Sequence, residues 1–206
     1  TTATEEIERR WNEPSVERST VSIVTRFETV IKNADEFIRE AESQVNVSLG
    51  VEHFERLRPA LREATGRGIR VNLSIHTPDA GRETLPDAEE LSEVCSEARH
   101  RRLPSPFAVI VDRTKTCFAQ HAGSMNEYGV HVDDRTHTYV FHWYFLTTQW
   151  DMWEPIYSSL SDEPPIEYVD IRYCVRDVAP LLRDGATVKV RIEGADTETG
   201  APSRSS

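Results

Sequence analysis

Apolar and polar residues follow regular periods along the first part of the chain. Residues 20–24 alternate like a strand, and residues 27–41 carry apolar side chains at the three- and four-residue spacing of a buried helical stripe. Residues 45–49 and 69–75 alternate again, and a second helical pattern covers residues 54–64 between them. Because both helices have the length of crossover connections, this β-α-β-α-β order predicts an α/β fold with a parallel sheet.

The middle of the chain is predicted to contain short strands. Residues 107–111 form a continuous apolar run, which is typical of a strand buried on both faces. Residues 128–132 and 136–141 have the pattern of the two arms of a hairpin. The pattern also predicts a loop over residues 77–86, a helix over 87–99 and a strand over 116–119.

Residues 142–157 are predicted to form a helix with an aromatic stripe. Trp143, Trp150 and Trp153 lie on this stripe at helical spacing. We expect them to contribute to a homodimer interface, because aromatic residues are enriched in such interfaces. The alternative is that the three tryptophans fill the core. Further along, residues 171–182 predict a helix and residues 188–192 a strand.

The charge of the chain changes the range of possible partners. The net charge is −11, and only Lys32, Lys115 and Lys189 are lysines among the 24 cationic residues. This balance indicates a salt-adapted cytoplasm, because excess acid keeps halophilic proteins soluble; the alternative is a mildly acidic mesophile with GC-rich codons. Nucleic-acid binding depends largely on neutralising phosphates. We therefore expect no direct DNA contact by this chain.

The sequence also limits the compartment. No stretch has the roughly 20 apolar residues that a membrane-spanning helix needs, and residues 1–18 lack the pattern of a secretory signal. Cys95, Cys117 and Cys174 are odd in number and widely spaced, which fits a reducing compartment better than a disulfide framework. The predicted location is the cytoplasm, without membrane association.

The candidate catalytic and metal motifs are weak. Gly66 and Gly68 follow a helix and precede a strand, which is the reverse of the order in a dinucleotide-binding loop. His131, His137 and His142 form no compact ligand pattern with cysteine or aspartate. We therefore predict no cofactor and no metal site.

One segment indicates the ancestry of the domain. After the β-α-β-α-β start, residues 103–114 contain a strand that ends at Asp112, and this order resembles one half of a phospholipase-D-type fold. In active members that strand carries H-x-K-x-x-x-x-D. Counting back from Asp112, Ser105 and Phe107 occupy the positions of the histidine nucleophile and the lysine. The resemblance thus implies the fold without its phosphodiesterase chemistry.

A phospholipase-D-like domain without catalytic residues resembles the sensing domain of TrmB-type archaeal transcription regulators, and the stretch over residues 134–143 resembles members from salt-loving archaea. The other stretches that resemble this family, in chain order, cover residues 14–17, 107–118, 170–188, 191–194 and 199–200.

The family resemblance implies a division of the chain. We expect a connector helix over residues 1–18 and a phospholipase-D-like sensing and dimerisation domain over residues 19–160, with a parallel or mixed sheet flanked by helices. Residues 161–206 are expected to hold the beginning of a small C-terminal β subdomain and a polar tail. Family members contact DNA through an N-terminal winged helix, which we expect to be absent from this chain.

The functional prediction is the effector-sensing and dimerisation portion of a regulator of sugar metabolism. Asp112, Arg113, Arg172 and Glu193 are the candidate sugar ligands, because planar polar groups bind hydroxyls; the alternative for each is a solvated or salt-bridged role. Two other functions remain open. One is a stand-alone interaction module without ligand or DNA binding, and the other is an enzyme that the motifs do not reveal.

Overall fold

The computed structural model divides the chain into two compact units, Thr1–Ser159 and Leu160–Ser206. The connector helix predicted over residues 1–18 lies outside the described residues. The structure describes residues 20–77, 84–120, 128–159, 171–188, 192–195 and 202–205.

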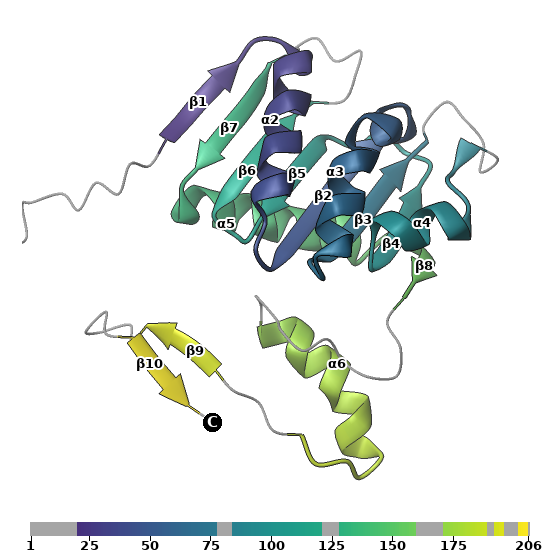
Figure 1. The fold of residues 1–206 in the computed structure, drawn as a ribbon, viewed down its shortest axis with the longest axis vertical. Coiled ribbons are helices and arrows are strands. Elements are labelled where there is room, and N and C mark those ends of the chain that lie inside the picture. The colour runs from purple at the N-terminus through teal and green to yellow at the C-terminus, as the bar shows by residue number, and fades with distance from the viewer. Residues whose placement is uncertain are drawn as a thin grey trace, which may run out of the picture. The chain divides into compact units, whose positions relative to one another are not determined.

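In the described part of the first unit, eight strands form one mixed sheet in the order β1-β7-β6-β5-β2-β3-β4-β8 (Figure 1). β2 is parallel to β3 and β3 is parallel to β4, whereas the other neighbouring pairs are antiparallel. The predicted α/β class is confirmed. The strands are β1 (Thr20–Val24), β2 (Gln44–Gly50), β3 (Arg70–His76), β4 (Glu97–Arg101), β5 (Phe107–Val111), β6 (Lys115–Ala119), β7 (Gly129–Asp133) and β8 (Glu154–Ser158).

Helices cover both faces of this sheet. On one face lie α2 (Phe27–Glu40), α3 (Phe54–Gly66) after the short 3-10 turn η1 (Val51–His53), and α4 (Ala88–Val94) (Figure 1). On the other face lies α5 (Arg135–Tyr144), which continues into the π-helical turn η3 (Phe145–Trp150). None of the described helices is long and apolar enough to cross a membrane.

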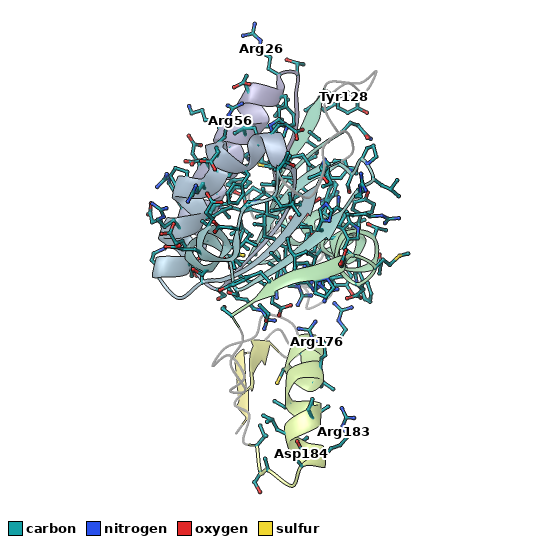
Figure 2. All side chains as sticks on the ribbon, turned by 90° about the vertical axis from the view of Figure 1, so that its right-hand side faces the viewer. Arg26, Arg56, Tyr128, Arg176, Arg183 and Asp184 are labelled. Carbon is teal, nitrogen blue, oxygen red and sulfur yellow. The ribbon has the colours of Figure 1, made fainter. Side chains whose placement is uncertain are left out.

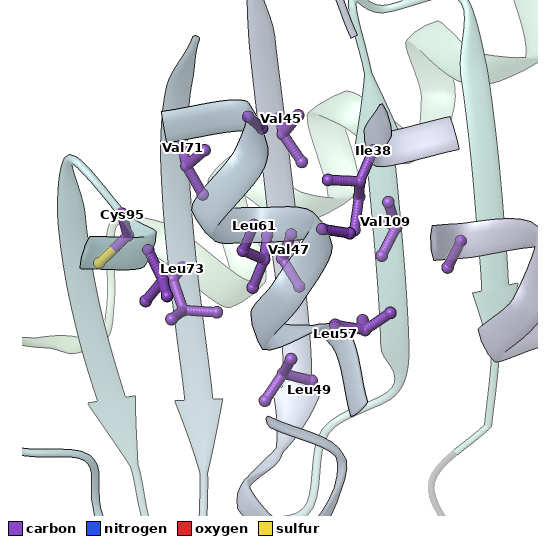
Figure 3. Packing of buried hydrophobic residues seen from close by; sticks show 14 of the residues in the cluster. Ile38, Val45, Val47, Leu49, Leu57, Leu61, Val71, Leu73, Cys95 and Val109 are labelled. Carbon is purple, nitrogen blue, oxygen red and sulfur yellow. The ribbon is translucent and has the colours of Figure 1, made fainter. Parts of the chain in front are cut away.

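The apolar core lies between α2, α3 and the sheet (Figure 3). The alternation of β2 and β3 directs every second side chain toward these helices. Burial of a Val, Leu or Ile side chain stabilises a fold by about 1.5–3 kcal/mol, so this layer supplies much of the folding free energy. Fully buried members are Ile38, Val45, Val47, Leu49, Leu57, Leu61, Val71, Leu73 and Val109.

The opposite face of β2 and β3 is polar, yet it is also buried. Asn72 Nδ2 donates to Asn46 Oδ1 at 2.8 Å, and Asn46 Nδ2 lies 3.4 Å from His142 Nδ1 of α5. Ser74 Oγ donates to the carbonyl oxygen of Gln149 in η3 at 2.5 Å. Because buried polar groups need partners, these bonds fix α5 and η3 on this face of the sheet.

Three local predictions are wrong. Residues 128–141 form no hairpin: the side chain of Asp134 accepts a hydrogen bond from the backbone N–H of His137, and this N-cap starts α5 directly after β7. The helix predicted over residues 142–157 gives way to η3 and then to β8. The helix predicted over residues 87–99 ends at Val94, and β4 follows it.

The β-α-β-α-β order predicted that β1 joins the parallel strands, and this prediction is wrong. It lies at the edge of the sheet and is antiparallel to β7, with Thr20 opposite Asp133 and Val24 opposite Gly129. Alternation identifies a strand but not its neighbour, so the sequence did not reveal this pairing.

The second unit contains one helix and a strand pair in its described residues. α6 (Ile171–Arg183) confirms the predicted helix, and Gly185 follows it with a φ of +87°, a conformation that favours glycine. Arg176 and Arg183 extend from α6 in Figure 2. β9 (Ile192–Ala195) pairs antiparallel with β10 (Pro202–Ser205).

Candidate ligand site beside the Asp112 turn

The turn between β5 and β6 has an unusual backbone conformation. Asp112 and Arg113 have φ values of 50° and 59°, in the left-handed region that few non-glycine residues adopt. Aspartate tolerates this region better than most residues because its short side chain can form local hydrogen bonds. The turn therefore needs a compensating interaction, which the Asp112 carboxylate provides.

The Asp112 carboxylate holds the start of β2. Its Oδ1 accepts hydrogen bonds from the backbone N–H groups of Ser43 and Gln44 at 2.9 and 2.8 Å, and its Oδ2 accepts one from Glu42 at 2.9 Å. Both oxygens are thus engaged by the protein's own backbone. Among the predicted ligand residues, Asp112 therefore makes structural contacts, which join the turn to the start of β2.

Arg113 borders a pocket on the α5 side of the sheet. Its guanidinium carbon lies 5.6 Å from the centre of the Tyr139 ring, a cation–π distance. A pocket of about 300 Å³ is lined by Arg113, Arg135, Thr136 and Tyr139. It combines planar hydrogen-bond donors, a hydroxyl group and an aromatic ring, and none of its described lining residues carries a carboxylate.

The first turn of α5 contributes the pocket residues that sequence reasoning missed. Arg135 and Thr136 directly follow the N-cap Asp134, and Tyr139 lies one turn further on. Hydrogen bonds from His137 to Asp134 hold the pKa of the Asp134 carboxyl below its usual range. The sequence signal for the start of this helix was Asp134, because aspartate is a preferred N-cap residue. The predicted hairpin instead placed Asp134 in a turn.

Two of the predicted ligand residues lie in the second unit. Arg172 is exposed near the start of α6, and Glu193 lies in β9. The structure brings Arg113 and the α5 residues together in one pocket. The role of Arg172 and Glu193 as sugar ligands stays a prediction.

The two positions that hold histidine and lysine in active phospholipase-D-type enzymes are buried in this chain. Ser105 is 6% exposed, and its hydroxyl oxygen accepts a hydrogen bond from Gln149 Nε2 at 2.8 Å. Phe107 is 2% exposed and packs edge-on against Phe27 with ring centres 5.5 Å apart. Neither side chain is placed to attack a substrate. In the described residues, no group of three or more His, Cys, Asp or Glu side chains is arranged to hold a metal ion.

The three tryptophans of the predicted interface lie in different environments. Trp150 and Trp153 are 0% and 3% exposed, and the Arg99 guanidinium stacks over Trp150 at 4.5 Å. Both side chains are buried in the interior of a single chain, as the core-filling alternative predicts. Trp143 is 40% exposed beside Tyr139 on α5, and it remains the candidate contact residue.

Comparison with solved structures defines the class of fold. NucT from Helicobacter pylori has a TM-score of 0.52 at 11% identity, over 67% of this chain and 99% of that chain. Nuc from Salmonella typhimurium, described as a phospholipase D family member, has a TM-score of 0.48 at 14% identity, over 68% and 99% of the two chains. The likeness to NucT, which has the higher TM-score, shows the predicted phospholipase-D-like fold.

A family model identifies the chain more closely. Residues 20–157 match the model described as transcriptional regulator TrmB, EBD N-terminal subdomain. The chain therefore belongs to the TrmB family of transcriptional regulators, whose effector-binding domain (EBD) includes this subdomain.

One solved structure links the fold to this family. TrmBL2, described as an archaeal chromatin protein with a novel mode of DNA binding, has a TM-score of 0.54 at 17% identity, over 74% of this chain. The chain spans 60% of the length of TrmBL2. No curated protein sequence matches the chain.

Proposed function

We propose that this chain is the effector-sensing and dimerisation portion of a TrmB-like regulator of sugar metabolism. The observation that carries the proposal is the match of residues 20–157 to the N-terminal subdomain of the TrmB effector-binding domain. A winged helix outside residues 1–206 contacts DNA in this proposal. The description of TrmBL2 as DNA-binding supports such an arrangement, since only part of its length corresponds to this chain.

The effector site in this proposal is the pocket beside Arg113. Ligand sites combine an apolar or aromatic surface with a few well-placed polar groups. The Tyr139 ring offers the aromatic surface, while Arg113, Arg135 and Thr136 offer donors to sugar hydroxyls. Arg172 and Glu193 of the second unit are also proposed as sugar ligands.

The chain has no catalytic activity of its own in this proposal. Ser105 and Phe107 stand where the related enzymes need histidine and lysine, and both are buried. The net charge of −11 and the three lysines support a protein of a salt-adapted archaeal cytoplasm. The proposed division is a connector over residues 1–18, the sensing and dimerisation domain over 19–160, and the start of the C-terminal subdomain over 161–206.

A thermal-shift screen against neutral sugars tests the effector site. A ligand at 100 times its Kd stabilises the folded state by about 2.7 kcal/mol, so a true effector raises the melting temperature measurably. Arg113→Ala should abolish the shift. The matched control is Arg62→Ala, because Arg62 is an exposed arginine on the opposite face of the sheet that pairs with Glu93. A shift that survives Arg113→Ala would place the sugar elsewhere.

A second candidate function is supported by the outer surface of α5. Val140 is 66% exposed and Trp143 is 40% exposed on this helix. A stand-alone interaction module would use this surface to contact another protein. Light scattering in molar salt distinguishes the two, since the regulator portion predicts a dimer and the module predicts a monomer.

A further inference from the structure

β1 lacks the features that usually keep an edge strand from pairing with another chain. Within the described residues it is bonded only to β7, so no described strand pairs with its other side (Figure 1). Natural edge strands are commonly blunted by lysine, proline, a bulge or inward-pointing charge. The sequence of β1 is Thr-Val-Ser-Ile-Val, which contains none of these residues, and its register with β7 is continuous.

The strand also exposes apolar side chains. Val21 is 51% exposed and Ile23 is 71% exposed. Ile23 lies opposite Val130 of β7, and Val130 lies opposite Phe118 of β6. The ring of Phe118 packs against the ring of Phe141 in α5, with the ring centres 5.2 Å apart. An apolar row thus runs from the sheet edge to α5.

The charge distribution favours contact here. Two copies of a chain with a net charge of −11 repel each other, and the repulsion is smallest where the facing surfaces lack carboxylates. β1 is uncharged, and residues 135–150, which form α5 and η3, contain no aspartate or glutamate. Arg26 and Tyr128, labelled in Figure 2, flank the end of β1 where it meets the start of β7.

We propose that β1 pairs antiparallel with β1 of a second copy, about a two-fold axis at Ser22. In this register Ser22 faces Ser22 of the partner subunit, and Val21 faces Ile23 of the partner subunit. The strand is self-complementary, because opposed residues point to the same face of a sheet. The pairing joins the apolar rows of the two copies and continues the sheet across the dimer.

This inference rests on the proposed dimerisation and names the surface that produces it. It does not depend on Trp143, which lies on α5. Screening shortens the reach of the repulsion from about 10 Å at 0.1 M salt to about 3 Å at 1 M. The dimer should therefore be tighter in molar salt than in 0.1 M salt.

A cysteine cross-link tests the register. In antiparallel pairing, opposed Cα atoms lie about 4.5–5.5 Å apart, within the range that a disulfide spans. Ser22→Cys should therefore form a covalent dimer under mild oxidation. Ile23→Cys is the matched control, because the two copies of residue 23 lie diagonally, about 7–8 Å apart, and should cross-link poorly. Equal cross-linking of both variants would overturn the register.

Sedimentation in molar salt tests the surface itself. Ile23→Lys places a charge on the exposed edge and should convert the dimer into a monomer with an unchanged circular dichroism spectrum. Val140→Lys makes a similar change on the outer surface of α5, where Val140 is 66% exposed, and should leave the dimer intact.

Two outcomes of the sedimentation experiment would overturn the β1 pairing. A dimer that survives Ile23→Lys but is lost in Trp143→Ala retains the proposed dimerisation and moves its surface to α5. A parent chain that stays monomeric in molar salt, with no cross-link through residue 22, contradicts dimerisation as well, while the thermal-shift screen still decides effector binding.

Discussion

Replacing Asp112 by alanine should destabilise the protein strongly, because its carboxylate holds two distant segments together. The carboxylate accepts hydrogen bonds from the backbone N–H groups of Glu42, Ser43 and Gln44. The substitution also leaves alanine at a φ of 50°, where its Cβ is disfavoured. The variant thus tests whether Asp112 is an anchor or a ligand.

The size of the effect follows from these contacts. A hydrogen bond to a charged group contributes about 1.5–3 kcal/mol, and the bond to Glu42 is exposed, so water replaces part of it. With the backbone strain added, Asp112→Ala should lower the free energy of unfolding by about 3–5 kcal/mol. Asp112→Asn keeps an acceptor oxygen and tolerates the conformation, so it should cost about 1–2 kcal/mol.

Urea unfolding followed by circular dichroism measures both values. The matched control is Asp133→Ala, which removes the same charge from an exposed position and should change stability by less than about 0.5 kcal/mol. If the alanine variant does not fold, the asparagine variant gives the measurement. A cost below about 1 kcal/mol for Asp112→Ala, combined with loss of sugar binding, would refute the anchoring role.

Three further predictions follow from burial. Burial raises the pKa of the Cys95 and Cys117 thiols to about 12, so both should resist alkylation at pH 8 until the chain unfolds; rapid labelling of the native protein would contradict this. Burial lowers the pKa of His131 despite the opposing charge of Asp133. The neutral His131 side chain therefore contributes stability that is present above the unfolded pKa of about 6.5 and is lost as pH falls through the folded pKa. In His131→Gln the free energy of unfolding, measured in urea, should vary less with pH over that window. Trp150→Ala should cost about 3–5 kcal/mol and exposed Trp143→Ala much less; the reverse order would mean that the burial is misassigned.

Strong periodicity allowed much of the sheet and its helices to be predicted. The helical stripe over residues 27–41 became α2, and the apolar run over residues 107–111 became β5. Both bury apolar surface against the same core, so pattern and packing agree. The pattern failed for β4, whose Glu97 and His100 are buried although their types are polar. This segment forms a strand because it pairs with β3 and β8. Such long-range pairing leaves no periodic pattern in the sequence.

The candidate site was predicted only in part, for a similar reason. Asp112 and Arg113 stood out because they follow a buried strand, but the use of Asp112 depends on backbone N–H groups of a segment far away in the sequence. Tyr139 was missed because its segment was predicted as a strand, which gave it no place beside Arg113. Once Asp134 is recognised as the N-cap of α5, Tyr139 lies on a helix instead of in a strand.

Calorimetric titration of residues 1–206 with a sugar that gives a thermal shift measures effector binding at the pocket beside Arg113. Saturable heat is expected for the parent chain and for Arg62→Ala, and none for Arg113→Ala or Tyr139→Ala. Absence of heat with every sugar, while a longer protein that contains this chain does bind one, would contradict the pocket beside Arg113 as the effector site.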